Sequence, residues 1–343
     1  MQRRHLLQLA SVHAAAACAP AAFAQGGLTA VKFTLDFRIS GQTAPFLVAL
    51  YKGYYREEGL DVSIDVGNGS VASITRVASG AYDLGFGDVS SLIEFDAQQP
   101  GAPLVQAVYQ YYNRAPFAII GRKDRGISGD FKSLAGKRIA AAAVESTRRA
   151  WPMAAKKAGM KADALQWVTT DFGARDNVVV RGDVDGATYF HDSAVSLFQR
   201  MKADELSVLP YSSVGLALYG NAVLASTKLI ARSPKVVAGF VRATNRGLMD
   251  TFANPLAAMA YVKQREPLID EKVEVERWKI TAGYVAAADT RAHGVGDVRK
   301  DLVEEQIAEV AATFDLKSRP GFDALYNLGF LPPKAERMAG GKA

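Results

Sequence analysis

Strand-like and helix-like segments alternate along the chain after residue 30, and this alternation limits the folds that the sequence can adopt. Alternating apolar residues mark the strands, and helical apolar spacing marks the segments between them. The predicted strands are 32–37, 60–66 and 82–87, and the predicted helices are 46–52, 71–79 and one that begins at 88–91. A strand–helix–strand order of this kind favours a parallel sheet with right-handed crossovers.

A second series of the same kind follows further along the chain. Its predicted strands are 138–144, 166–170 and 186–190, and its predicted helices are 149–158 and 178–181. Pro152 lacks an N–H group, so we expect it in the first turn of its helix, which places the helix start no earlier than about Arg149.

Two extended segments, 115–121 and 221–226, bracket this second series. The bracketing predicts one lobe inserted into another, whereas one continuous doubly wound sheet is the alternative. Residues 30–118 together with 224–343 would form lobe one, and residues 119–223 would form lobe two. Helical spacing predicts further helices at 234–252, 255–264 and 302–314.

The first 24 residues have the pattern of a signal peptide. Arg3 and Arg4 precede an apolar, alanine-rich stretch, and the small-x-small sequence 22–24 precedes Gln25. We therefore expect cleavage after residue 24 and export, by the twin-arginine or the general secretory route. A lipid anchor at Cys18 is a weaker alternative because the residues before it make a poor lipobox. An amphipathic N-terminal helix of the folded domain is the alternative to a signal peptide.

Composition excludes several functional classes. Cys18 is the only cysteine, so a processed chain has no thiol for disulfides, metal thiolates or a cysteine nucleophile. Only His191 and His293 remain after processing, and neither has metal-ligand spacing. We expect no metal, no cofactor and no catalytic residue. The net charge of +6, or +4 without Arg3 and Arg4, is spread along the chain and excludes a nucleic-acid footprint. No apolar run after residue 30 approaches 18 residues, which excludes a membrane-spanning helix in the body.

Several segments resemble the solute-binding proteins of ABC importers that handle thiamine-pyrimidine precursors, nitrate, taurine and alkanesulfonates. The most specific is 52–62, Lys-Gly-Tyr-Tyr-Arg-Glu-Glu-Gly-Leu-Asp-Val. Further matches in the expected order are 35–37, 44–46, 77–85, 133–139, 182–187, 233–237 and 243–247. The resemblance covers about 31–260, with weaker support to the C-terminus.

This resemblance implies an α/β class protein of the type II periplasmic-binding fold. Such a protein has two lobes, two parallel-rich sheets and two interlobe crossings, and it closes around a ligand by a hinge motion. The implied partners are a small-molecule ligand and an ABC permease with its ATPase. We expect a periplasmic monomer that binds no nucleic acid.

Ligands of α/β sheets bind beyond the carboxyl ends of the strands, which gives the candidate ligand-binding residues. In lobe one they are Asp36, Phe37, Thr43, Asn68, Gly69, Ser70 and Asp88, with Tyr112 just before the first crossing. In lobe two they are Glu145, Ser146, Thr147, Tyr189, His191 and Asp192, and the segment 171–172 is a further strand end.

Each lobe-one candidate also has a purely structural interpretation. Backbone N–H groups of 67–70 suit anionic oxygens, but the segment could equally be a turn with Ser70 as the helix N-cap. Asp88 could accept hydrogen bonds from a ligand or cap its own helix. Asp36 and Phe37 match the Asp–aromatic pair of the family, in which the ring stacks on a flat ligand, although Phe37 could instead lie in the core.

The lobe-two candidates have similar alternatives. Glu145 with Arg148 could make a charged contact or a solvated surface pair. Three polar residues at the end of a buried strand are expected to face the cleft, namely Tyr189, His191 and Asp192, with His191 as a hydrogen-bonding partner and not a catalyst. The tyrosines of 109–112 could wall an aromatic ligand or pack the hinge.

We therefore predict a non-enzymatic exported receptor that captures a small organic ligand for a membrane permease. The mixture of carboxylates, helix N-termini and aromatic rings favours a flat heteroaromatic or an aromatic carboxylate over nitrate or sulfate, and a sulfonate or taurine-like ligand is also compatible. The alternative is an enzyme related to eukaryotic thiamine-pyrimidine synthase, whose cysteine-rich stretch and iron have no counterpart in a cysteine-free chain. A sensor or co-receptor role is a third possibility.

Overall fold

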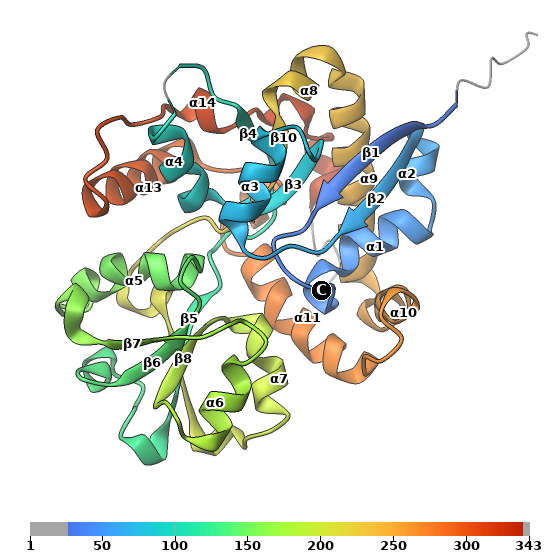
Figure 1. The fold of residues 1–343 in the computed structure, drawn as a ribbon. Coiled ribbons are helices and arrows are strands. Elements are labelled where there is room, and N and C mark those ends of the chain that lie inside the picture. Colours follow the sequence, from blue (N-terminus) through green and yellow to red (C-terminus); the bar gives the residue numbers. More distant parts are fainter. Residues whose placement is uncertain (1–26, 100, 339–343) are drawn as a thin grey trace, which may run out of the picture.

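The computed structural model describes residues 27–99 and 101–338, which form two α/β lobes (Figure 1). The expected signal peptide at 1–24 and the possible anchor at Cys18 lie outside the described residues. Within the described ranges, no helix is both long enough and apolar enough to cross a membrane.

Lobe one is built on a five-stranded sheet in the order β2-β1-β3-β10-β4. Its strands are β1 (Thr29–Thr34), β2 (Leu60–Asp65), β3 (Leu84–Asp88), β4 (Val105–Gln110) and β10 (Asn221–Ser226). β1 pairs in parallel with β2 and β3, whereas β10 runs antiparallel to both of its neighbours.

Lobe two repeats this plan in the order β7-β6-β8-β5-β9. Its strands are β5 (Phe117–Arg122), β6 (Arg138–Ala141), β7 (Gln166–Thr169), β8 (Gly186–Phe190) and β9 (Leu206–Pro210). β6 pairs in parallel with β7 and β8, and β5 is the antiparallel strand. The sheets are therefore parallel-rich, as expected, and each contains one strand that breaks the parallel pattern.

The two antiparallel strands are the extended segments that bracket the second lobe. The chain enters the second sheet at β5 and returns to the first at β10, so it crosses between the lobes twice. The boundaries expected at 118/119 and 223/224 fall inside these two strands, a few residues after the crossings. Strands β4 and β9 have no counterpart among the predicted elements.

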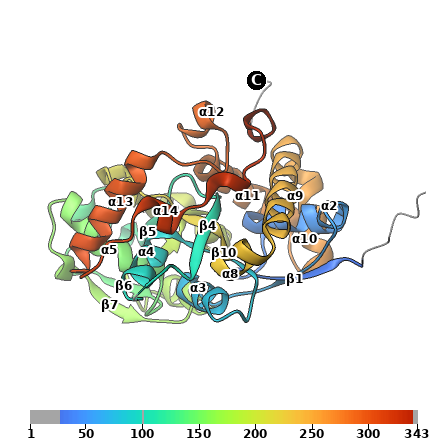
Figure 2. The same cartoon turned by 90° about the horizontal axis from the view of Figure 1, so that it is seen from above.

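Helices cover both faces of each sheet (Figures 1 and 2). Those of lobe one are α1 (Ala44–Tyr51), α2 (Tyr54–Glu57), α3 (Ser70–Ala78), α4 (Val89–Ala97), α8 (Thr227–Arg232), α9 (Pro234–Ala253), α10 (Pro255–Arg265), α11 (Glu271–Val285), α12 (Thr290–His293), α13 (Lys300–Thr313) and α14 (Phe322–Leu325). Those of lobe two are α5 (Ser146–Lys157), α6 (Arg175–Arg181) and α7 (Val195–Phe198).

The core of lobe one depends on close packing between α1 and α9. Residues 44–49 of α1 are all buried. A Cβ atom at Gly247 would lie 2.2 Å from the Pro45 carbonyl oxygen, so only glycine allows the two helices to approach this closely. A second cluster extends from α3, α4 and α13 into lobe two, where Trp151 of α5 is its largest side chain.

Two local predictions were wrong. Helix α5 begins at Ser146, and Pro152 lies inside it because residues 150, 151 and 153–155 are buried and their packing offsets the lost hydrogen bond. Ser70 is the first residue of α3, and its N-cap is Gly69, whose φ of 95° belongs to a conformation that glycine tolerates best.

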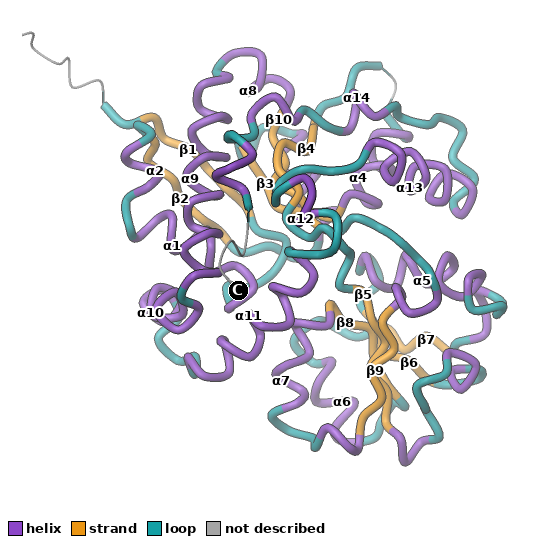
Figure 3. The backbone as a smooth tube through the Cα atoms, turned by 180° about the vertical axis from the view of Figure 1, so that it is seen from behind, coloured by secondary structure: helices purple, strands orange, loops and turns teal. Residues whose placement is uncertain are grey.

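Helix α11 was not predicted, yet it lies between the lobes (Figures 1 and 3). It contacts α10 and residues 41–43 of lobe one, and it also contacts α7 and residues 191–194 of lobe two. Its apolar residues do not gather on one side, because its interlobe face is polar: Glu274, Arg277 and Thr281 are all buried.

Candidate functional site

A pocket lies between the lobes, beyond the carboxyl ends of strands from both sheets. Lobe one supplies residues that follow β1 and residues that begin α3, and lobe two supplies residues that follow β6, β7 and β8. The lining residues are Asp36, Phe37, Gln42, Gly69, Ser70, Glu145, Ser146, Phe172, Arg175, Phe190 and Ser193.

Aromatic rings from the two lobes meet in this pocket. The ring centroids of Phe37 and Phe172 are 5.1 Å apart, and their planes make an angle of 60°. The guanidinium of Arg175 lies 5.4 Å from the Phe172 centroid and 4.2 Å from that of Tyr189. Cations over ring faces in this range stabilise the arrangement, so Arg175 helps to hold Phe172 in place.

Asp36 places a carboxyl group at the base of the pocket. Its Oδ2 accepts a hydrogen bond from Asn221 Nδ2 at 2.6 Å and a longer one from Ser70 Oγ at 3.4 Å. Burial raises the pKa of Asp36 to about 7, and the hydrogen bond from Asn221 partly offsets this rise. The group can therefore donate or accept a hydrogen bond near neutral pH.

Glu145 and Arg175 form a buried ion pair at the lobe-two side. Arg175 Nη1 lies 2.7 Å from Glu145 Oε1, and Thr188 Oγ1 donates to Glu145 Oε2 at 2.9 Å. Burial raises the pKa of Glu145, and the charge of Arg175 counters this rise. Arg175 Nε and Gln42 Oε1 are buried with no hydrogen-bond partner among the described residues. The pocket thus offers a free donor from one lobe and a free acceptor from the other.

The lobes are closed over this pocket. Ser91 Oγ of α4 lies 3.3 Å from Ser146 Oγ of α5, and Glu94 of α4 pairs with Arg149 of α5. The cavity volume is about 40 Å³, whereas ligand pockets usually measure about 300–1,000 Å³. A ligand larger than a few atoms therefore requires the lobes to separate before it can enter.

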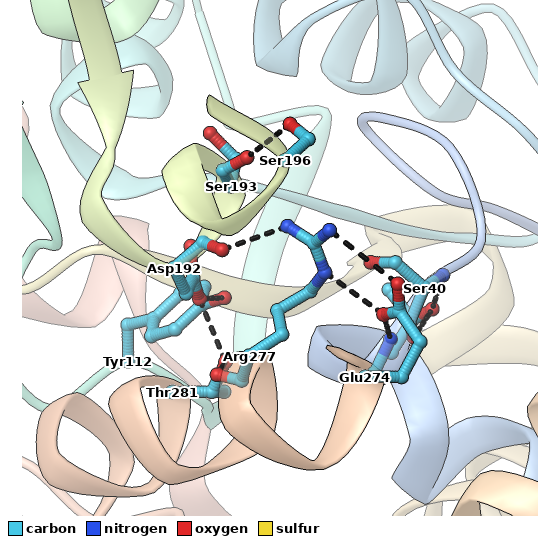
Figure 4. A network of polar contacts seen from close by, with 10 residues as sticks. Ser40, Tyr112, Asp192, Ser193, Ser196, Glu274, Arg277 and Thr281 are labelled. Atoms are coloured by element: carbon cyan, nitrogen blue, oxygen red, sulfur yellow. Dashed lines mark hydrogen bonds and ion pairs between the residues drawn. The ribbon is translucent and has the colours of Figure 1, made fainter. Parts of the chain in front are cut away.

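A second set of interlobe contacts surrounds Asp192 at the start of the segment that follows β8 (Figure 4). Tyr112 Oη donates to Asp192 Oδ2 at 2.6 Å, and Thr281 Oγ1 donates to the same oxygen at 2.9 Å. Arg277 Nη1 donates to the Asp192 carbonyl oxygen at 2.8 Å. We call this set, Tyr112, Asp192, Arg277 and Thr281, the Asp192 clasp.

The Asp192 clasp is connected to the loop after β1 through Glu274. Arg277 Nε lies 2.8 Å from Glu274 Oε2, and the Gly41 amide donates to the same oxygen at 2.5 Å. Burial raises the pKa of Asp192, and the hydrogen bonds from Tyr112 and Thr281 counter the rise. Two hydroxyl groups of lobe one thus hold a buried carboxylate of lobe two, and Arg277 holds the backbone carbonyl of the same residue.

Six of the predicted ligand-binding residues line the pocket: Asp36, Phe37, Gly69, Ser70, Glu145 and Ser146. The amides of Gly67 and Gly69 donate to the carbonyl oxygens of Phe37 and Asp36, so these two amides are not available to an anion. Glu145 pairs with Arg175 and not with Arg148, whose guanidinium lies over Trp167.

The other eight predicted residues do not line the pocket, because each is engaged elsewhere or points away from it. Asp88 caps α4 by accepting from the Ser91 amide at 3.0 Å, and Asn68 is exposed. Thr43 Oγ1 bonds to the Ser40 backbone, Thr147 Oγ1 donates to the Tyr189 carbonyl, Tyr189 Oη donates to Asp176, His191 Nδ1 pairs with Tyr284 Oη at 3.0 Å, and Tyr112 and Asp192 belong to the clasp.

Five lining residues were not predicted as ligand-binding: Gln42, Phe172, Arg175, Phe190 and Ser193. Phe172 and Phe190 lie at strand ends that the sequence had marked, so weighting aromatic residues at those ends would have found them. Arg175 carries no such signal, because it begins a helix several residues after its strand. In the described part of the chain, no three His, Cys, Asp or Glu side chains are arranged to hold a metal ion.

Comparison with known proteins gives related sequences for most of the chain. Residues 40–258 match the family described as NMT1/THI5 like. The riboflavin-binding protein RibY of Chloroflexus aurantiacus is 32% identical over 244 residues, which cover 71% of this chain and 68% of RibY. A 4-amino-5-hydroxymethyl-2-methylpyrimidine phosphate synthase of Aspergillus parasiticus is 25% identical over 268 residues, covering 74% of this chain and 76% of the synthase.

Solved structures identify the fold. The periplasmic aliphatic sulphonate binding protein SsuA of Escherichia coli superposes with a TM-score of 0.66 at 14% identity, covering 85% of this chain and 94% of SsuA. The two lobes, each built on a mixed five-stranded sheet, therefore have the periplasmic binding protein fold.

Proposed function

The chain belongs to the NMT1/THI5 like family, and from this membership and the geometry of its pocket we propose that it is an exported, non-enzymatic receptor for a flat heteroaromatic molecule. In this proposal the ligand binds between the lobes, and the closed protein delivers it to the permease of an ABC importer in the periplasm.

The observation that carries the proposal is the pair of rings at the pocket, Phe37 from lobe one and Phe172 from lobe two. At 5.1 Å between centroids they contact each other directly. Atoms in contact are about 3.5–4.0 Å apart, so a planar ligand stacked between the rings would hold them roughly 7 Å apart. A ligand that enters while the lobes are open would then replace one ring–ring contact by two ring–ligand contacts on closure.

The polar atoms at the pocket suit the edge of a nitrogen heterocycle. Arg175 Nε can donate to a ring nitrogen or carbonyl, and Gln42 Oε1 can accept from a ring N–H or amino group. Asp36 can do either, because its pKa is raised to about 7. The names of the two relatives, one for riboflavin and one for a pyrimidine phosphate, support the same ligand class.

Simple anions fit the pocket less well. Arg175 is the only cation among the pocket residues, and Glu145 already neutralises it. The rival function, an enzyme of the pyrimidine-phosphate synthase type, is favoured only by sequence similarity to such synthases. The resemblance implies cysteine-dependent iron chemistry for that reaction, and Cys18 is the only cysteine.

Thermal unfolding in the presence of a ligand panel tests the proposal. The panel contains riboflavin, pyrimidines and aromatic carboxylates, with taurine, alkanesulfonates and nitrate as the competing class. A ligand at about 100 times its Kd stabilises the protein by roughly 2.7 kcal/mol, which shifts Tm by a few degrees. We expect such a shift with a heteroaromatic compound. A shift only with sulfonates or nitrate, or conversion of the bound compound into a product, would contradict the proposal.

The substitution Phe172→Leu tests the stacking geometry. Aromatic pairs contribute about 0.5–1.5 kcal/mol beyond their buried area, so affinity for the heteroaromatic ligand should fall by up to about tenfold in a calorimetric titration. The matched control is Phe322→Leu, which changes a half-buried ring on α14, away from the pocket. Equal ligand affinities of the wild-type protein and the Phe172 variant would show that the Phe172 ring does not stack on the ligand.

A further inference from the structure

A larger groove adjoins the pocket and also lies between the lobes. Its volume is about 570 Å³, and its polar lining includes Arg38 and Ser40 of lobe one and Ser196 and Gln199 of lobe two. The two spaces have no lining residue in common and approach each other at Arg38, which directly follows Phe37 of the pocket and lies over its ring. On the other lobe, Ser196 Oγ donates to the carbonyl oxygen of the pocket residue Ser193 at 3.2 Å.

Arg38 brings a positive charge to this border. It forms no ion pair or hydrogen bond with any residue that the structure describes, and its guanidinium lies 5.3 Å from the Phe37 ring centroid. The two carboxylates whose charges act on Arg38 are already engaged, because Asp176 accepts a hydrogen bond from Tyr189 and Glu274 pairs with Arg277. Burial, and after it the neighbouring charge of Arg277, lower the pKa of Arg38, and the charges of Asp176 and Glu274 partly offset this fall.

Ser40 supplies a second, independent indication of a missing partner. Its side chain is only 4% exposed, and its Oγ has no hydrogen-bond partner among the described residues. Figure 4 shows Ser40 beside the Glu274–Arg277 pair, on the lobe-one side of the groove. Buried hydroxyl groups nearly always have a partner, so an unpartnered hydroxyl that lines a groove is a position for a ligand atom.

Glu266 also lines the groove and forms no ion pair among the described residues. The groove is therefore positive only on the side that borders the pocket. An anionic group attached to a ring in the pocket would reach Arg38 first, because Arg38 is the chain neighbour of the stacking residue Phe37. Glu266 would oppose the same anion at longer range, which makes its charge useful as a test.

We propose that the groove is a second subsite that binds the phosphate ester of a phosphorylated heteroaromatic ligand, with Arg38 and Ser40 as hydrogen-bond donors. This inference rests on the proposed function, since it assigns the ring of the same ligand to the pocket. It extends that function by making the receptor selective for phosphorylated over unphosphorylated compounds. Charge-assisted hydrogen bonds from an arginine to a phosphate are among the strongest that a side chain can make.

Isothermal titration with matched pairs of compounds tests the subsite. The pairs are riboflavin with riboflavin 5′-phosphate, and pyridoxine with pyridoxine 5′-phosphate. In at least one pair the phosphorylated compound should bind the wild-type protein about tenfold more tightly or better. Arg38→Gln should abolish this preference by weakening the phosphorylated compound far more than the unphosphorylated one, and Ser40→Ala should reduce the preference.

Two further variants separate a specific contact from a general effect of charge. Glu266→Gln should strengthen binding of the phosphorylated compound. Arg291→Gln, which removes an exposed positive charge on α12 outside the groove, should leave the preference intact. Equal weakening by Arg38→Gln and Arg291→Gln would show a nonspecific charge effect and overturn the subsite.

The failure of this inference differs from the failure of the proposed function. If the unphosphorylated compound binds and the phosphate ester adds no affinity, the second subsite is wrong and the heteroaromatic pocket stands. An equal loss of affinity for both members of a pair in Arg38→Gln would also overturn the subsite. If none of these compounds binds, the proposed function fails and the subsite fails with it.

Discussion

Three aspartates, Asp36, Asp88 and Asp96, are buried in ways that raise the pKa of each to about 7. A folded-state pKa above the unfolded value means that the folded protein binds more protons in this pH range. The stability that these groups contribute is then fully present below about pH 4 and is lost as the pH rises to 7. These three aspartates should therefore make the folded protein less stable at pH 8 than at pH 4.

Asp96 gives the clearest test, because both of its carboxylate oxygens are buried without a partner among the described residues. Asp96→Asn cannot ionise, so it should raise the free energy of unfolding at pH 8 and have little effect at pH 4. The gain should be at most about 4 kcal/mol, since one pKa unit corresponds to about 1.4 kcal/mol. Urea unfolding at both pH values measures it.

The control for this prediction is Asp61→Asn on β2, where the carboxylate is exposed. This substitution should leave the pH dependence of stability as it is in the wild-type protein. If Asp96→Asn destabilises the protein equally at pH 4 and pH 8, then the carboxylate has a partner or a shape that the amide cannot replace.

Sequence patterns identified pocket residues only where a position at the end of a strand was enough to bring the residue to the pocket. Asp36 and Phe37 come soon after β1, Glu145 and Ser146 directly follow the predicted strand 138–144, and the rule that ligands bind beyond strand ends selected all four. The same rule also selected Tyr189 and Asp192, but their side chains bond to other protein residues and do not line the pocket. Their partners, Asp176 for Tyr189 and Thr281 for Asp192, are distant in sequence, so the sequence does not reveal these bonds.

At the scale of elements, α11 decides how the lobes meet. It is anchored to lobe one through the Glu274–Gly41 contact, and it reaches lobe two through Arg277 and Thr281 in the Asp192 clasp. The clasp holds the lobes in the closed arrangement, because opening would break the hydrogen bonds that Tyr112 and Thr281 donate to the Asp192 carboxylate.

Thr281→Val removes one donor of the Asp192 clasp and keeps the side-chain shape. It should favour the open arrangement, so the radius of gyration of the ligand-free protein in solution scattering should increase. Affinity for ligand should fall by about tenfold, because a hydrogen bond to a charged group contributes roughly 1.5–3 kcal/mol.

Thr251→Val on α9 is the matched control, since that buried threonine bonds only to the Gly247 carbonyl of its own helix. It should change neither the radius of gyration nor the affinity. An unaltered radius of gyration and affinity in Thr281→Val would show that the clasp does not hold the lobes together.

Helix α11 also shows where pattern reading fails for elements. A helix is found by an apolar stripe at a period of 3.6 residues, but α11 buries Glu274, Arg277 and Thr281 between the lobes, so its stripe is polar. A polar stripe with the same spacing would have identified it. Helix α5 shows the reverse case, in which tertiary packing of Trp151 overrides the local preference of Pro152.

At the scale of the whole molecule, the alternation of strands and helices and the two bracketing segments favoured an inserted lobe over one continuous sheet, and the resemblance to solute-binding proteins implied the two lobes that are observed. The bracketing segments also marked the two crossings, because β5 and β10 are the strands that run antiparallel in each sheet. The closeness of the lobes was not predictable, since it depends on contacts such as Phe37 with Phe172 and Glu94 with Arg149.

The most direct test of the account is a distance measurement across the cleft. Asn68 follows β2 in lobe one and Val144 follows β6 in lobe two, and both side chains are exposed. Cysteines placed at these two positions in the chain from residue 25 onward would be its only thiols, because Cys18 lies upstream. Spin labels on them report the separation of the lobes by pulsed electron resonance.

The account predicts a broad distance distribution without ligand, from open and closed arrangements in exchange, and a single shorter distance at saturation with the heteroaromatic compound that raises Tm. The same distribution with and without saturating ligand would contradict binding between the lobes.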